Sequence, residues 1–504
     1  MTKKHLISLA TLLLAVTMTS CELDYAPENT YVDSKVYRMA KTAEAALAGA
    51  YVRLNVFLSG APQDQNNYPN TGDVFLLADF TTENLKARDN SVNYIAIETS
   101  EYSNNERDGI VASMYRHGYN AIDFANNIIK GIRTYGTYDQ QLQLQHIAEA
   151  RFIRAYIYFQ LLCMFGDQAL LGNDTGDGVV LQTEPYNGYI PGDYMGRSSN
   201  AECWAFIINE LDEAIADLPD EVPTIAKRIR ANKSVAKALL SRVLLYKATA
   251  TDNRTELQRA ATLAKDILDN TAYSFASSPS EFTANLFPSN EYSQASGYPD
   301  PVSRSNELIF FEPSRLYTDN YPNGLYYYKK NSYYVPAEAI QAYDADDVRR
   351  TQLIVGGSPT DYPTDWTSAK YLGSNYDDVI YIRLAELKLT YAEAITRATG
   401  NVSQEAVGQL NDVHQRAFPE DLKPALYTTA SFSSPTALLQ AILKERRLEL
   451  AYEGHYRWDL MRSDNLLGDQ RLGAIAKNRW NLPVPDYEVR FTEGTIRQNS
   501  GYQD

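Results

Sequence analysis

Three glutamates in the stretch KERRLELAYEGHYRWDLMR are the first candidates for acid–base chemistry. Glu445, Glu449 and Glu453 follow one another at intervals of four residues. Glycoside hydrolysis needs two carboxyl groups that face each other across the scissile bond. Residues four apart on a helix project from the same face, so these glutamates do not suit that reaction. We therefore predict salt bridges that hold the last helices to the rest of the protein.

The remaining reactive residue types show no catalytic spacing. The histidines of the mature chain, His117, His146, His414 and His455, lie far apart and lack ligand spacing such as HExxH. No nucleophile elbow, phosphate-binding loop or dinucleotide fingerprint occurs. The acidic run YDADDVRR (343–350) lacks the ordered oxygen ligands of a calcium loop, so we expect it to be solvated. The sequence predicts a protein that is not an enzyme and that holds no metal or cofactor.

Tyrosine is in excess, with 38 Tyr against 16 Phe. A tyrosine joins a flat apolar face to a hydroxyl group that needs a partner or water, so the excess predicts partly exposed aromatic surfaces. The densest cluster lies in 317–336, and 83–108 mixes tyrosines with polar residues. Sugars need both, because an apolar ring face packs on aromatics while hydroxyls need polar partners. The predicted ligand-binding residues are Arg88, Asn90, Tyr94, Tyr102, Asn104, Tyr321, Tyr326, Tyr328 and Tyr333. The alternative is that these tyrosines pack loops onto the scaffold or contact a partner protein.

Helical spacing of apolar and small residues organises most of the chain. It occurs in 36–58, 109–133, 140–165, 200–218, 232–250, 255–270, 380–398, 403–417, 435–453 and 456–463. Small residues at one offset and aromatic residues at another favour stacked helix pairs of the tetratricopeptide type. The segment 271–379 is irregular, and no long linker divides the chain. We predict one all-α domain over 21–504, with a helical scaffold mainly in 36–270 and 380–465 and a loop-rich insertion at 271–379.

The amino terminus has the layout of an export signal. Lys3 and Lys4 precede an apolar run at 6–16, and small polar residues then lead to Cys21. The run is too short to span a bilayer. It resembles a bacterial lipoprotein signal, which implies removal of 1–20 and lipidation of Cys21 as the first mature residue. The alternative is an ordinary signal peptide with an incidental cysteine.

Charge and cysteine content limit the possible partners. The formal net charge of −16 argues against a nucleic-acid or anionic-membrane surface, and neutral partners fit better. Contact with the membrane is then through the lipid anchor only. Cys163 and Cys203 lie in helical patterns, and we expect two buried thiols rather than a disulfide.

Seven blocks of the sequence together resemble the SusD/RagB family. They are PENTY (27–31), AEARFIRAYIYFQLLCMFGD (148–167), AKALLSRVLLY (236–246), YIRLAELKLTYAEA (381–394), LNDVHQRA (410–417), ILKERRLELAYEGHYRWDLMR (442–462) and NLPVPDYEV (481–489). The resemblance implies an all-α fold with tetratricopeptide-like helix pairs and a loop-rich ligand-binding face. It also implies that the loop just before the helix beginning near Asp108 borders that face.

Members of that family are surface-exposed outer-membrane lipoproteins that capture nutrients, most often oligosaccharides or polysaccharides. They form a lid over a SusC-like TonB-dependent transporter. The resemblance therefore implies a non-catalytic, lipid-anchored protein that binds a glycan and delivers it to such a transporter. Two alternatives stay open. One is capture of peptides for the same kind of transporter, and the other is a surface glycoside hydrolase.

Overall fold

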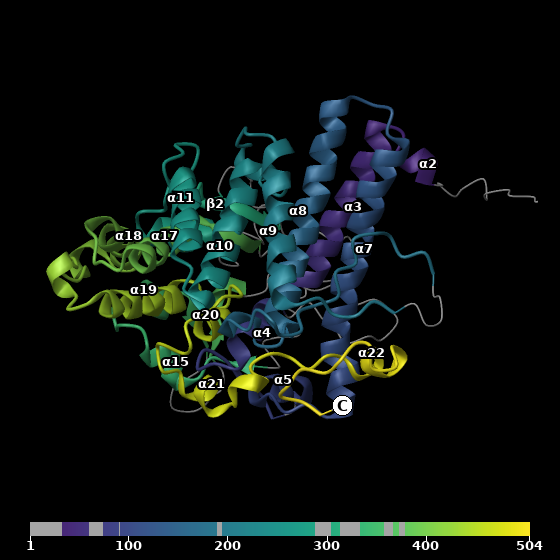
Figure 1. The fold of residues 1–504 in the computed structure, drawn as a ribbon. Helices are drawn as coiled ribbons and strands as arrows, with labels where there is room; N and C mark the ends of the chain where they lie inside the picture. The colour runs from purple at the N-terminus through teal and green to yellow at the C-terminus, as the bar shows by residue number, and fades with distance from the viewer. Residues whose placement is uncertain are drawn as a thin grey trace, which may run out of the picture.

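Long helices that follow one another in the chain also lie next to one another in space (Figure 1). The computed structural model describes residues 33–59, 74–89, 91–188, 194–287, 304–312, 333–356, 366–371 and 378–503. The long helices are α3 (Ala40–Ser59), α7 (Ala112–Tyr135), α8 (Gln140–Phe165), α9 (Asn200–Asp217), α10 (Lys233–Thr251), α11 (Arg254–Leu268), α17 (Leu384–Thr399), α18 (Gln404–Arg416) and α19 (Pro435–Glu449). Each packs against the next from α3 to α18, and α19 packs against α17. This succession is the predicted stack of helix pairs.

Capping residues explain where these helices begin and end. The Asp139 side chain accepts a hydrogen bond from the Leu142 N–H at 2.9 Å, and α8 starts directly after it. Ser199 and Glu202 form a reciprocal capping box at the start of α9. Gly400 ends α17 in the left-handed region, with φ of 67°. Because these caps are local, the helix bounds agree closely with the sequence pattern.

Two of the predicted helix boundaries are wrong. The segment predicted as a helix from 380 begins as strand β6 (Val379–Arg383), which pairs antiparallel with β2 (Leu308–Glu312). The residues of β6 are buried on both faces, so their burial favours a strand between layers over one side of a helix. Helix α19 ends at Glu449 instead of 453, because Tyr452 and Gly454 take positive φ values in the following turn.

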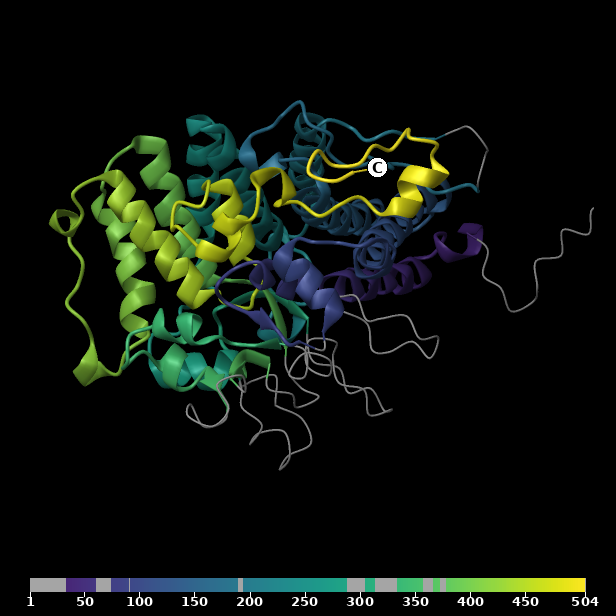
Figure 2. The ribbon, with the colours of Figure 1, turned by 90° about the horizontal axis from the view of Figure 1, so that it is seen from below.

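The irregular region takes part in two further ladders, one with residues 86–87 and one within the region itself. Strand β1 (Lys86–Ala87) pairs with β3 (Tyr333–Tyr334), and β4 (Ile354–Val355) pairs with β5 (Thr367–Ser368), both antiparallel. The short α-helices are α2 (Asp33–Val36), α4 (Val74–Phe80), α5 (Val92–Thr99), α6 (Asn104–Glu106), α12 (Pro279–Glu281), α15 (Ala337–Gln341), α16 (Val348–Thr351), α20 (Tyr456–Arg462), α21 (Gln470–Ala474) and α22 (Asp486–Phe491). Many of them gather below the long helices in Figure 1. Figure 2 shows the carboxyl-terminal segment, in yellow, running across this end.

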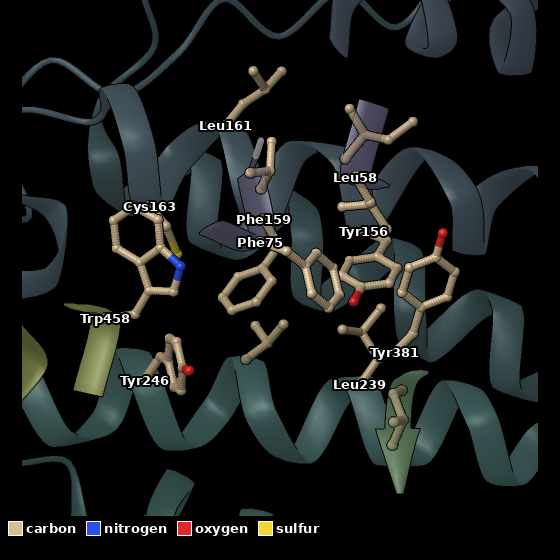
Figure 3. Close-up of a cluster of buried hydrophobic side chains, with 14 of the residues drawn as sticks. Leu58, Phe75, Tyr156, Phe159, Leu161, Cys163, Leu239, Tyr246, Tyr381 and Trp458 are labelled. Atoms are coloured by element: carbon tan, nitrogen blue, oxygen red, sulfur yellow. The ribbon is translucent and has the colours of Figure 1, made fainter. Parts of the chain in front are cut away.

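Aromatic side chains fill the space between α8, α10 and β6 (Figure 3). The rings of Phe159 and Tyr246 lie 5.4 Å apart between centroids, and Tyr156 meets Tyr381 edge-on at 6.3 Å. Trp458 is buried beside them and is a packing residue. Such close aromatic packing fixes the distance between neighbouring helices.

The two cysteines of the described chain are free thiols, as predicted. Cys163 and Cys203 are both buried and not bridged. Burial raises the pKa of both thiols, so each behaves as a small apolar side chain. Among the described residues, no helix is at once long enough and apolar enough to cross a bilayer.

Candidate functional site

The glutamates of 445–453 lie inside the protein and are surrounded by basic side chains. Glu449 Oε1 lies 2.5 Å from Arg383 Nη1, and Glu453 Oε2 lies 2.7 Å from Arg383 Nε. Glu445 Oε1 lies 2.5 Å from Arg349 Nη1. The buried charge cluster consists of Glu307, Asp347, Arg349, Lys370, Arg383, Arg416, Glu445, Glu449 and Glu453. The prediction of structural salt bridges is confirmed for these glutamates.

The ionisation of Glu449 is that of a structural ion pair. Burial raises the pKa of this carboxyl group, but Arg416 and Arg383 outweigh burial and hold the pKa well below its usual range. A general acid for glycoside hydrolysis needs the opposite, a raised pKa and a proton to donate. Helices α8 and α9 are joined by a similar buried ion pair, in which Arg154 Nη2 lies 2.5 Å from Glu210 Oε2.

A pocket of about 470 Å³ opens beside Trp366. Its lining residues are Ala337, Ile340, Gln341, Arg350, Thr351, Ile354 and Trp366. We call it the Trp366 pocket. Its volume lies within the range of roughly 300–1,000 Å³ that small-molecule sites occupy, and its mixture of apolar and polar lining is typical of such sites.

Backbone pairing fixes one wall of the Trp366 pocket. Strand β4 pairs with β5 so that Val355 lies opposite Thr367, which brings the end of β4 next to the residue that precedes β5. That residue is Trp366, and its backbone carbonyl accepts a hydrogen bond from the Val335 N–H at 2.8 Å. Trp366 is therefore held by chain segments on both sides of it.

The buried charge cluster fixes the opposite wall through α16. Asp347 caps this helix by accepting from the Arg349 N–H at 2.8 Å, and its carboxylate lies 2.7 Å from Arg349 Nη2. The prediction that 343–350 is solvated is therefore wrong for Asp347, which is buried because Arg349 compensates its charge. Arg350, the next residue, lines the pocket.

The arrangement suits binding better than catalysis. The half-buried Trp366 lines the pocket with an aromatic side chain. Gln341 and Arg350 carry N–H donors, and Thr351 carries a hydroxyl group. None of the described lining residues is an aspartate or glutamate, so the lining supplies no pair of carboxyl groups for hydrolysis.

Comparisons with known proteins cover both halves of the fold. Residues 312–481 match the family described as "SusD family", and residues 31–245 match the family described as "Starch-binding associating with outer membrane". The two ranges do not overlap, and the first contains the Trp366 pocket.

The chain belongs to the SusD/RagB family.

Alignments with similar proteins cover nearly the whole SusD-like chain. It is 24% identical to a SusD-like protein of Bacteroides ovatus, covering 98% of this chain and 88% of that protein. It is also 24% identical to SusD-like protein P2 of Formosa agariphila, covering 99% and 100%. A SusD superfamily structure from Bacteroides vulgatus superposes with a TM-score of 0.72 at 20% identity, covering 93% and 100%. The structure of a laminarin binding SusD-like protein superposes with a TM-score of 0.70 at 20% identity, covering 92% and 100%. These likenesses confirm the predicted all-α SusD-like fold.

The structure brings together the two segments predicted to bind ligand, because β1 pairs with β3. The contact is buried, however. Tyr94 stacks on Phe80 with 4.7 Å between ring centroids, and Phe80 meets Tyr333 edge-on at 6.0 Å. Tyr94 is 9% exposed and Tyr333 is 3% exposed. The prediction of partly exposed rings is wrong for these two residues, because their rings fill the space under the β1–β3 ladder.

Arg88 lies beside strand β3, which leads to the Trp366 pocket. Its guanidinium carbon lies 5.8 Å from the centroid of the half-buried Tyr334 ring. The residue after Tyr334, Val335, is the one bonded to the Trp366 carbonyl. Contact between Arg88 and a ligand stays a prediction.

Tyr102 and Asn104 lie with the carboxyl-terminal segment instead. The Tyr102 ring is 7% exposed and packs edge-on against Tyr502 at 6.0 Å. Asn104 is exposed at the start of α6. Nearby, Arg107 pairs with Asp486 at 3.2 Å. Tyr102 is thus a packing residue, and a ligand contact of Asn104 stays a prediction.

The remaining predicted residues lie outside the described part of the chain. They are Cys21, Asn90, Tyr321, Tyr326 and Tyr328. Their roles stay predictions.

Sequence reasoning missed Trp366, although the chain gave a signal for it. The other three tryptophans, Trp204, Trp458 and Trp480, are all buried. Trp366 stands in the irregular segment between a threonine–aspartate pair and a threonine–serine pair. Aromatic residues are enriched at binding surfaces, so Trp366 was a candidate alongside the tyrosines.

Proposed function

We propose that this SusD-like protein binds an oligosaccharide or polysaccharide in the Trp366 pocket and serves nutrient uptake without cleaving its ligand. The observation that carries the proposal is an accessible indole beside amide, guanidinium and hydroxyl groups, in a pocket lined by no described carboxylate. A sugar can stack its apolar face on Trp366, while its hydroxyl oxygens accept hydrogen bonds from the side chains of Gln341 and Arg350. Membership of the SusD/RagB family and the likeness to a laminarin binding SusD-like protein support the same function.

We further propose that Cys21 is lipidated, that the protein is exposed on the outer membrane, and that it delivers its ligand to a SusC-like TonB-dependent transporter. The layout of residues 1–21 and the outer-membrane wording of the matched family support this location. Replacing Cys21 by alanine should move the protein from the membrane fraction to the soluble fraction. Retention of Cys21→Ala in the membrane fraction would reject lipid anchoring.

Calorimetric titration with a panel of neutral and acidic oligosaccharides tests ligand binding. Trp366→Ala should weaken binding of the best ligand by about 2 kcal/mol, or roughly thirtyfold in Kd, because it removes the aromatic anchor. Tyr186→Ala is the matched control. This aromatic residue is 62% exposed and is attached to α7 through its N–H to Asp123, so its loss should leave Kd unchanged.

Each outcome of the titration decides one part of the proposal. Equal affinity of the wild type and Trp366→Ala rejects the pocket. Binding of peptides but of no glycan favours peptide capture, and release of reducing sugar from a bound glycan would show a hydrolase instead.

A further inference from the structure

Arg350 is a half-buried cation that lines the Trp366 pocket. Within the described residues, its side chain makes no hydrogen bond or ion pair. Four other described arginines share that property, namely Arg38, Arg53, Arg133 and Arg254, but all four are exposed to solvent. A guanidinium that loses part of its hydration without gaining a partner is unfavourable, and a bound anion would remove this cost.

The described carboxylates near Arg350 in the chain form no ion pair with it. Asp347 pairs with Arg349 inside the buried charge cluster. Glu338, at the start of α15, lies 2.8 Å from Arg471. Asp344 and Asp346 are exposed in the turn before α16 and do not line the Trp366 pocket. Among the described residues, no carboxylate therefore compensates the positive charge of Arg350.

A second cavity, which also has a cation in its lining, borders the end of α15. It has a volume of about 380 Å³ and is lined by Lys444 and Arg447 of α19 and by Ala342, the residue after α15. Its described lining contains no aspartate or glutamate. Next to Ala342, the Tyr343 hydroxyl donates to the Leu448 carbonyl at 3.1 Å and holds this turn on α19. We call it the Lys444 cavity.

The two cations of the Lys444 cavity differ in availability. Arg447 donates to Asn84 Oδ1 at 2.9 Å and lies 3.2 Å from Glu83, so its charge is partly compensated. Lys444 is exposed and has no hydrogen bond or ion pair within the described chain. The neighbouring Glu445 turns the other way, into the buried charge cluster, because successive helix residues point about 100° apart.

We propose that the ligand is an acidic glycan, with Arg350 binding a carboxylate or sulfate ester in the Trp366 pocket and Lys444 meeting a second anionic group. This inference rests on the proposed function. It replaces the expectation of neutral partners drawn from a net charge of −16, because a ligand meets the local potential of its site and not the charge of the whole molecule. A planar guanidinium binds carboxylate and sulfate oxygens through paired N–H donors.

Three size-matched probes test the proposal: a neutral laminari-oligosaccharide, an oligogalacturonide and a sulfated carrageenan oligosaccharide. We expect the wild type to bind one of the acidic probes at least roughly tenfold more tightly than the neutral one at low salt, with the difference shrinking at high salt. Arg350→Gln should abolish that preference and lower the neutral affinity by a much smaller factor, because a neutral sugar loses only one hydrogen bond to the guanidinium. Arg350→Lys should retain part of it, because the charge stays while the paired donors are lost.

Lys444→Gln should reduce the acidic preference by a smaller factor, and only for probes long enough to reach both cavities. The control is Arg254→Gln, which removes an exposed, unpartnered arginine elsewhere and should change nothing. Tighter binding of the neutral probe, or an equal loss of all three affinities in Arg350→Gln, overturns the inference. If the wild type binds none of the three probes, the proposed function itself is rejected. The two failures are thus distinguishable.

Discussion

Replacing Arg383 by methionine should lower the free energy of unfolding by about 3–5 kcal/mol. The guanidinium is 1% exposed and meets three carboxylates: Glu307 at 3.0 Å, Glu449 at 2.5 Å, and Glu453 at 2.7 and 2.8 Å. Methionine fills a similar volume but leaves those carboxylates buried without this partner. Loss of one member of a buried ion pair costs about 3–5 kcal/mol, chiefly because the charge left behind stays desolvated.

The remaining cations limit the loss to that range. Glu307 and Glu449 keep contacts with Arg416, and Glu453 keeps Lys370 at 2.6 Å. Without them, three isolated carboxylates would have to take up protons or water.

Urea denaturation followed by far-ultraviolet circular dichroism measures the effect. Arg497→Met is the matched control, since Arg497 pairs with Asp177 at 2.8 Å while its own side chain is 72% exposed. An exposed pair contributes at most about 1 kcal/mol. If Arg383→Met and Arg497→Met shift the unfolding free energy by the same small amount, the buried charge cluster does not stabilise the fold and our reasoning is wrong.

Two other predictions concern single buried positions. Burial raises the pKa of Asp79 from 3.8 to about 7, so the folded protein holds a proton that the unfolded chain has released, and stability falls as pH rises through this window. Asp79→Asn should remove this pH dependence, which amounts to about 3 kcal/mol of unfolding free energy between pH 5 and pH 8. Urea titrations of the variant and the wild type at both pH values measure it. A difference in stability between the two proteins that is the same at both pH values would contradict the prediction. Gly131→Ala should destabilise the protein by about 1–3 kcal/mol, because the added Cβ would lie 2.1 Å from the buried Tyr37 ring. Gly408→Ala, with no atom within 4 Å of the added Cβ, should stabilise α18 by up to about 1 kcal/mol, and melting temperatures that shift in the same direction for both glycine variants would refute this account.

The sequence alone determined the helical scaffold, because helix period and capping residues act over a few neighbouring positions. The predicted helix at 140–165 coincides with α8, which Asp139 caps. It also indicated that Glu445 and Glu449 form salt bridges, since residues four apart on one helix face do not make a catalytic pair.

The tertiary structure alone decided which aromatic residues are accessible. Tyr94 and Tyr333 were as plausible as Trp366 in the sequence, yet the pairing of β1 with β3 buries both tyrosines, while the β4–β5 ladder leaves Trp366 at a pocket. The sequence likewise did not show which arginine is paired. Asp347 and Glu445 neutralise Arg349, whereas no carboxylate in the described part of the chain neutralises Arg350. Exposure and charge compensation depend on residues distant in the chain, and no local pattern carries that information.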